Sequence, residues 1–263
     1  FLTIQQKERY GRYQATVSAN DIAGYFYLND DDLDWISKKR SEFTRLGYAL
    51  QLTSVRFLGT FLESDSHVPS LIVQVLASQV NVANLSCLND YWRSEQRWRH
   101  TTEIRTRYGY REFVDKGVRF RLGRLLCAMC WTGTDRPSIL FEHACVWLIK
   151  HKVLLPGVTT LERFIAEVRT RMESRLWYRL GQNINQEQKN QLENLLTNAD
   201  DNGRQSLLDK LRKGPVRVSS PSLVKALQRI ETIRSLNIVL PTPLYIPQVR
   251  LASLARFAGT AKV

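Results

Sequence analysis

Apolar residues recur every three to four positions along most of the chain, which is the spacing of one face of an α-helix. The row Leu46, Leu50, Phe57 and Phe61 shows this spacing, and the segment 222–236 repeats it. No run alternates apolar and polar residues as a half-buried strand does, and no internal repeat of fixed period is present. The pattern predicts an all-α fold.

Capping residues mark where several helices begin. Ser18 followed by Asp21 is a capping pair that opens a short helix through Phe26. The carboxylates of residues 30–32 suit the positive end of a helix that includes Trp35. Further helices are predicted after the proline at position 69 and near residues 86–108, 118–131, 138–151, 160–180, 187–197, 204–212 and 222–236.

Two breaks divide these helices into modules. Residues 81–86, NVANLS, form the first boundary. The second is the segment with Pro241, Pro243 and Pro247, where an extended linker is expected because proline disrupts helices. We predict a first helical module at residues 1–85, a second at 86–240, and a linker with the start of a downstream region at 241–263. The length of 263 residues agrees with about two domains.

Charge distinguishes the two modules. The net charge is +13, but residues 1–85 hold 8 basic and 9 acidic side chains, so the remainder carries +14. Of the 38 basic residues 27 are arginine, whose planar guanidinium grips a phosphate or a guanine edge with two hydrogen bonds. Double-stranded DNA is therefore the expected partner. The alternative is a solvated basic surface without a specific partner.

No feature of the sequence indicates a membrane or an export route. The longest apolar runs reach about a third of the 18 residues that a membrane helix needs. The first residues, FLTIQQKERYGRY, lack the order of a signal peptide. We expect a cytoplasmic protein that does not contact membranes, and its four cysteines suit a reducing compartment.

The cysteines are also the nearest approach to a metal site. Cys127 and Cys130 have the C-x2-C spacing of zinc ligands, and His143 and Cys145 follow. The pair lies in the apolar run LLCAMCW, however, and the other two residues are two positions apart in a helix, so they point in different directions. We interpret them as core residues and expect no metal or cofactor. Because no phosphate loop, metalloprotease motif or nucleophile elbow is present, no residue is predicted to be catalytic.

The densest basic segment, residues 93–124, predicts a DNA-binding surface. Within the helix expected at 86–108, Arg93, Arg97, His100 and Arg107 are spaced by four, three and seven residues and form one row without acidic residues. An exposed polar face with no ligand is the alternative. The other candidate contacts of the segment are Arg105, Arg111, Arg119 and Arg121.

Residues 139–171 have the outline of a helix-turn-helix. One apolar helix is followed by the helix breakers at 156 and 157, and Thr159 with Glu162 forms a capping box for a second helix. In this motif the N-terminal residues of the second helix contact base edges, here Thr159, Thr160 and Arg163. Arg169 and Arg171 lie further along and are candidates for phosphate contacts. Many helical hairpins share this outline.

The near-neutral first module offers fewer candidates. Lys38, Lys39 and Arg40 form its local basic cluster, and Arg45 and Arg56 are candidates for base contacts. Specific binding does not require a large charge, since phosphate contacts position a protein while base contacts specify sequence.

Several strings of residues resemble a known family. YGRY at residues 10–13, RLGYALQL at 45–52, RFLGTF at 56–61, IRTRYGYREF at 104–113 and LLPGVTTLER at 154–163 resemble, in this order, the N-terminal region of the Tn-three family of replicative bacterial transposases. The final stretch, QVRLASLARFAGTAKV, resembles the entry to the next segment of these proteins.

The resemblance implies that this region recognises the terminal inverted repeats of a transposon. It also implies a much larger parent protein, whose RNase-H-like domain holds divalent metal with an Asp-Asp-Glu triad outside this chain. Association with the nucleoid and self-association through the absent domains follow as expectations. The alternatives from other classes are a helical module that binds proteins and a helical domain that binds RNA.

Overall fold

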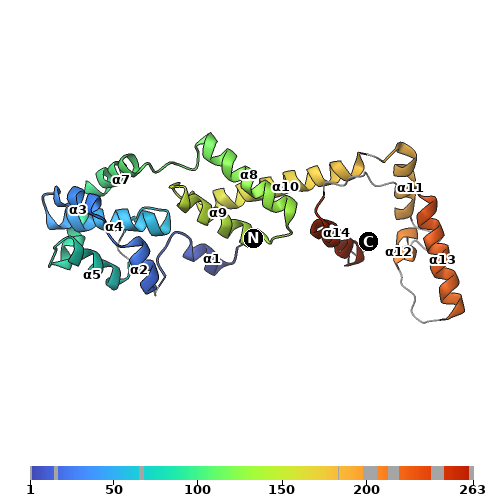
Figure 1. The fold of residues 1–263 in the computed structure, drawn as a ribbon, viewed down its shortest axis with the longest axis horizontal. Helices are drawn as coiled ribbons and strands as arrows, with labels where there is room; N and C mark the ends of the chain where they lie inside the picture. The colour runs from blue at the N-terminus through green and yellow to red at the C-terminus, as the bar shows by residue number, and fades with distance from the viewer. Residues whose placement is uncertain are drawn as a thin grey trace. The chain divides into compact units, whose positions relative to one another are not determined.

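The computed structural model describes residues 2–14, 17–64, 68–182, 184–197, 206–212, 219–237 and 246–260. These residues form α-helices joined by short connections and no extended strand, and an isolated bridge joins Arg111 to Val153 (Figure 1). The predicted all-α fold is confirmed. Within the described residues, no helix is long and apolar enough to span a bilayer.

The chain folds as two compact units. Unit 1 comprises residues 1–127 and 135–168, and unit 2 comprises residues 128–134 and 169–263. Two helices, α8 (Lys116–Thr132) and α10 (Val158–Gly181), contribute to both units. The remaining helices of unit 1 are α1 (Ile4–Arg9), α2 (Ala19–Tyr25), α3 (Asp30–Ser37), α4 (Glu42–Leu58), α5 (Ser70–Gln79), the 3-10 helix η1 (Leu85–Cys87), α6 (Leu88–Arg93), α7 (Gln96–Tyr108) and α9 (Pro137–Lys150).

The core of unit 1 is built around α4, which is buried from Leu46 to Val55. It packs against α2, α3, α5, α6, α7 and α9. Leu88, Tyr91 and Ile104 belong to the same core. The core therefore continues across residue 85 and does not coincide with the expected module boundary there, because the short connection 81–86 joins helices that share α4 as their packing surface.

Glycine allows two close approaches to α4. A Cβ at Gly47 would lie 2.4 Å from the ring of Tyr91, so the buried tyrosine occupies the space that a side chain would need. Gly59 ends α4 with a left-handed φ of 73°, and a Cβ there would lie 2.8 Å from both Ile149 and Leu155. The apolar row expected from Leu46 to Phe61 therefore ends before Phe61, which lies beyond the helix.

Capping groups begin the early helices as the sequence indicates. Ser18 and Asp21 form the capping box of α2, and Asn29 with Asp32 forms that of α3. The three carboxylates of residues 30–32 lie in the first turn of α3, where they oppose the positive end of the helix dipole.

Unit 2 contains the described helices α11 (Gln186–Leu196), α12 (Leu207–Arg212), α13 (Ser220–Ser235) and α14 (Gln248–Thr260) besides its parts of α8 and α10. Gln188 Nε2 donates to the carbonyl of Asn237 at 2.6 Å, which links α11 to the end of α13. Of the prolines in the expected linker, Pro241 and Pro243 lie outside the described residues, while the residues after Pro247 form α14.

Candidate nucleic-acid interface

The turn between α9 and α10 is fixed by backbone hydrogen bonds. The amide of Arg111 donates to the Lys152 carbonyl, and the amide of Leu154 donates back to the Arg111 carbonyl, both at 2.9 Å. The amide of Leu155 donates to the carbonyl of Gly59 at 2.8 Å. The turn is thus tied to the end of α4 and to the segment after α7, so the start of α10 has a defined position within unit 1.

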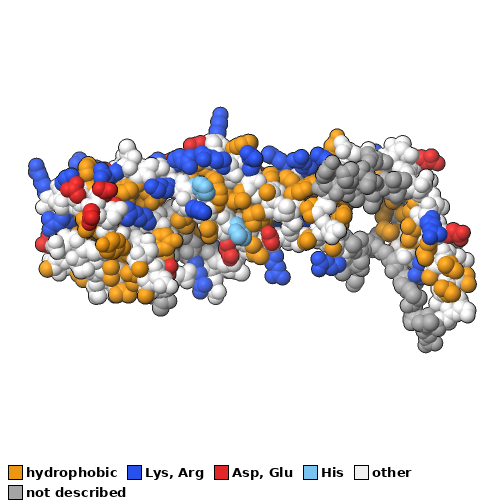
Figure 2. Space-filling model, viewed as in Figure 1, with side chains coloured by type: hydrophobic (Ala, Val, Ile, Leu, Met, Phe, Trp, Pro, Cys, Tyr) orange, Lys and Arg blue, Asp and Glu red, His pale blue; other side chains and the backbone are white. Residues whose placement is uncertain are grey.

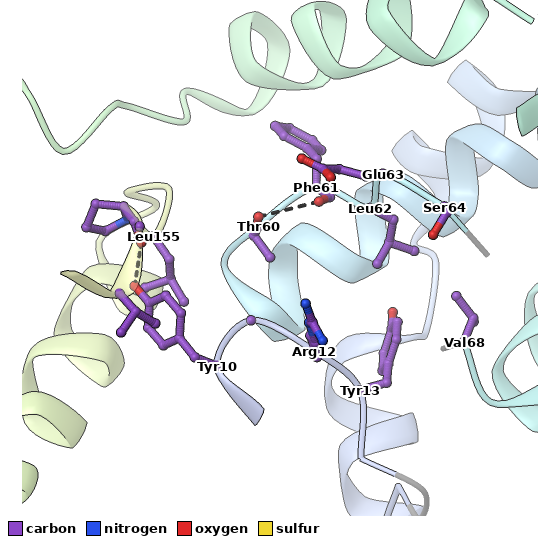
Figure 3. Close-up of a pocket in the computed structure, with 14 residues that line it drawn as sticks. Tyr10, Arg12, Tyr13, Thr60, Phe61, Leu62, Glu63, Ser64, Val68 and Leu155 are labelled. Atoms are coloured by element: carbon purple, nitrogen blue, oxygen red, sulfur yellow. Dashed lines mark hydrogen bonds between the residues drawn. The ribbon is translucent and has the colours of Figure 1, made fainter. Parts of the chain in front are cut away.

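The segment of α1 supports the same turn. The hydroxyl of Tyr10 donates to the Pro156 carbonyl at 2.8 Å, and Lys7 forms a 3.2 Å ion pair with Glu162 on the first turns of α10. A hollow of 540 Å³ adjoins this segment. Figure 3 shows the residues that line it, Arg12 among them. Leu155, Pro156, Gly157 and Val158 form the α10 side of this hollow. The motif YGRY thus lies beside the helix-turn-helix outline.

The start of α10 presents its polar residues to solvent. Thr159, Thr160 and Arg163 are exposed, whereas Leu161 and Ile165 are fully buried. The predicted capping box is wrong, because the amides of Thr160 and Leu161 donate to the Gly157 carbonyl and the helix begins before Thr159.

Helix α8 places cations beside α10. The guanidinium of Arg119 lies 5.3 Å from the ring centre of Phe164 and 5.9 Å from that of Phe113. Arg119, Arg121 and Arg124 are all exposed, and Figure 2 shows basic side chains gathered over α8. The structure therefore brings the predicted candidate Arg119 on α8 close to the candidate helix α10.

The predicted basic row on residues 93–107 is wrong as a single face. The expected helix 86–108 is interrupted at Ser94 and Glu95, so Arg93 ends α6 while the other members lie on α7. His100 is buried, within 3.2 Å of the Tyr91 hydroxyl. Burial lowers the pKa of His100 to about 4, so the imidazole is neutral at pH 7. Ile104 lies on the same face of α7 as His100 and is buried, so this side of the helix faces the core.

The other arginines of this segment have mixed surroundings. Arg93 is exposed, Arg97 donates to the Glu63 carbonyl, and Arg105 forms a 2.6 Å ion pair with Glu112. Arg111 is half-buried and serves mainly through its backbone in the turn described above.

Sequence reasoning missed the outward face of α7. Trp98 is 67% exposed, and it shares this face with Arg99, Thr102 and Thr106. The signal that could have found it is helical phase. If His100 and Ile104 point inward, residues two positions away lie about 200° around the helix and point outward.

The first-module candidates are largely occupied by carboxylates. Arg56 donates two hydrogen bonds to the buried Asp32, at 2.8 and 2.9 Å, and its guanidinium lies 5.3 Å from the ring centre of Tyr108. The guanidinium of Arg56 is therefore engaged within the protein, and its contact with bases stays a prediction. Lys39 forms a 2.7 Å ion pair with Glu103.

The remaining candidates differ in exposure. Lys38 pairs with Asp34 at 2.6 Å at the exposed end of α3, and Arg40 is exposed beyond it. Arg45 is half-buried in α4, and its Nε has no hydrogen-bond partner. Arg169 and Arg171 are exposed on the part of α10 that belongs to unit 2.

The four cysteines are half-buried. Burial raises the pKa of Cys145 to about 12, so this thiol stays protonated at neutral pH. Across the described residues, no group of three histidine, cysteine or acidic side chains has the geometry to hold a metal ion.

Comparison with known proteins identifies the class of this chain. The family described as a domain of unknown function, DUF4158, matches residues 1–168. The chain therefore belongs to this family, and the match ends at the same residue as unit 1.

The relatives with established names are transposases. The transposase for transposon gamma-delta from Escherichia coli (strain K12) is 42% identical over the whole chain, which covers 26% of that protein. The transposase for transposon Tn1546 from Enterococcus faecium is 29% identical over 90% of the chain, and the transposase for transposon Tn21 from Escherichia coli is 28% identical over 92%. The chain covers 24% of each of the last two proteins. The resemblance to these transposases is confirmed, and the chain spans about a quarter of their length.

Proposed function

We propose that this chain is the N-terminal DNA-binding region of a replicative transposase and that it recognises the terminal inverted repeats of its transposon. The observation that carries the proposal is the exposed start of α10 on a turn held by the backbone contacts to Arg111 and Gly59. A recognition helix needs this combination, because its first residues must reach base edges while the rest of the protein holds them in register.

In this proposal the roles are divided by position. Thr159, Thr160 and Arg163 contact base edges in the major groove, and the exposed cations of α8, Arg119 and Arg121, contact phosphates on the flanking backbone. The strand-cleaving chemistry belongs to the larger part of the transposase that lies outside these residues. We expect the protein to act in bacteria, in association with the nucleoid.

Salt dependence separates the proposal from a protein-binding module. Affinity for duplex DNA should fall with rising salt, with a log–log slope of about 0.9 for each phosphate neutralised. Competition between the repeat duplex and structured RNA separates the proposal from an RNA-binding domain. A chain whose duplex affinity does not change with salt, or that prefers RNA, would contradict the proposal.

Arg163→Ala is expected to reduce the preference for repeat over scrambled duplex by about 1–3 kcal/mol, because a bidentate contact to a base discriminates by this amount. Fluorescence anisotropy with both duplexes measures the preference. Arg163→Lys keeps the charge without the planar fork, so it should keep the salt slope but lose most of the preference.

The exposed Arg136 at the other end of α9 supplies the matched control. Arg136→Ala should leave the preference unchanged. Equal losses on repeat and scrambled DNA for Arg163→Ala would show that Arg163 touches only phosphate, which would remove it from the base-reading set.

A further inference from the structure

The outward face of α7 carries an aromatic and cationic surface that the recognition helix does not explain. We define the Trp98 surface as the residues around one shallow hollow of 770 Å³ between α3 and α7: Trp35, Trp98, Arg99, Thr102, Glu103, Thr106 and Arg107. Trp98 also lines a second hollow of 780 Å³, which faces the loop after α4. The indole thus stands between two hollows of unit 1.

Two arginines, one in this surface and one beside it, lie against aromatic rings. The guanidinium of Arg107 lies 4.1 Å from the ring centre of Trp35, and that of Arg97 lies 5.0 Å from the ring centre of Trp98. Such contacts keep a positive charge beside an aromatic face. Within the described part of the chain, Arg99 and Arg107 form no ion pair with a carboxylate.

The acidic member of the surface does not cancel this charge. Glu103 accepts hydrogen bonds from Lys39 at 2.7 and 2.8 Å and from the indole nitrogen of Trp35. Its carboxylate is therefore already neutralised by Lys39, and the exposed rim of the hollow remains positive through Arg99 and Arg107.

We propose that the Trp98 surface binds an unpaired segment of a DNA strand, with one base stacked on the Trp98 indole and the flanking phosphates beside Arg99 and Arg107. A flat aromatic ring, an apolar hollow and guanidinium groups without a carboxylate partner together match a ligand with an aromatic face and an anionic backbone. In a duplex the base faces are covered by their neighbours, so only an unstacked base offers its face to an exposed indole. The inference rests on the proposed function, to which it adds a second form of DNA.

The test uses the full chain and a labelled oligothymidylate of about 15 nucleotides, with binding followed by anisotropy. Trp98→Ala should weaken binding by about 5- to 150-fold, which is the range for loss of one stacked base. Trp98→Phe should keep most of the affinity because it keeps a ring. Since Trp98 is 67% exposed, neither substitution should alter thermal unfolding.

Two further variants separate stacking from charge. Arg99→Ala should lower the log–log salt slope by about 0.7, the value for one phosphate contact on a single strand, whereas Trp98→Ala should leave the slope unchanged. Trp177, which is 53% exposed on the unit 2 part of α10, is the control, and Trp177→Ala should bind as the unsubstituted chain does.

The proposal is overturned if the chain does not bind the oligonucleotide, if Trp98→Ala binds within twofold of the unsubstituted chain, or if Trp177→Ala loses as much. If Trp98→Ala binds the oligonucleotide as tightly as the unsubstituted chain, while the chain prefers repeat over scrambled duplex, this inference is rejected and the proposed function stands. If Trp98→Ala loses oligonucleotide binding, but the unsubstituted chain shows no preference for repeat duplex, the Trp98 surface is supported and the proposed function is rejected.

Discussion

Gly59→Ala is expected to destabilise unit 1 by about 2–4 kcal/mol. One part of this cost is the left-handed backbone, where φ is 73° and a Cβ is disfavoured by about 1 kcal/mol. The other part is a clash, because the new Cβ would lie 2.8 Å from Ile149 and Leu155, and overpacking of this kind costs about 1–3 kcal/mol. Denaturant unfolding of the variant measures the sum.

Gly109 separates the two parts of this cost. It ends α7 with a φ of 70°, but a Cβ there would meet nothing within 4 Å. Gly109→Ala should therefore lose only about 1 kcal/mol, from the backbone alone. Equal losses at the two positions would mean that the approach of the α9–α10 turn to Gly59 does not constrain the fold as the structure indicates.

Asp32→Asn is expected to destabilise unit 1 by about 2–3 kcal/mol. Asp32 is buried, and it accepts two hydrogen bonds from Arg56 and one of 2.7 Å from the hydroxyl of Tyr108. Removing one member of a buried pair leaves the other charge without compensation, which costs about 3–5 kcal/mol when both are fully buried. The Arg56 side chain is 24% exposed, so we expect a smaller loss.

The pH dependence of this contribution has a definite sign. Burial alone would raise the pKa of Asp32, but the hydrogen bonds from Arg56 and Tyr108 outweigh it and hold the pKa below its usual value. A lowered pKa in the folded state stabilises the protein above about pH 4 and loses this effect as pH falls further. The stability gap between the unsubstituted chain and Asp32→Asn should therefore narrow in acid.

Asp34 provides the control on the same helix. Its ion pair with Lys38 is exposed on both sides, with side-chain exposures of 67% and 58%. Asp34→Asn should change stability by no more than about 0.5 kcal/mol. A loss at position 34 as large as that at position 32 would contradict a special role for the buried carboxylate.

The helices themselves could be predicted because their signals are local. The capping box at Ser18 and Asp21 and the acidic first turn of α3 depend on residues within one turn of each other. The helix expected at 160–180 likewise follows from local spacing, and it corresponds to α10. These features need no knowledge of which helices meet.

The candidate interface could be predicted only in part, because exposure depends on tertiary partners. Arginine is a residue type expected at a DNA contact, but the guanidinium of Arg56 donates hydrogen bonds to Asp32, which lies 24 residues earlier in the sequence. By its position in the sequence His100 belongs to a basic row, but in the structure its ring packs against the rings of Tyr48 and Tyr91. The helices on both sides of the boundary expected at residue 85 likewise share one core, since both pack on α4.

Trp98 shows the opposite error. As a large aromatic residue, Trp98 is expected in the core. Its outward orientation follows only from its position around the helix relative to the buried Ile104. The buried hydrophobic residues of a helix therefore show which of its side chains point outward. A predicted basic row should first be checked for an aliphatic residue on the same face, because such a residue turns that face toward the core.

Footprinting of this chain on the terminal inverted repeat of its transposon tests the central claim most directly. The account predicts one protected stretch at a fixed register within the repeat and none on a scrambled duplex of equal length and composition. Arg163→Ala should weaken protection at a few adjacent base pairs while leaving the rest in place. Protection that is equally strong on scrambled DNA, or that has no fixed register, would contradict sequence-specific recognition by this chain.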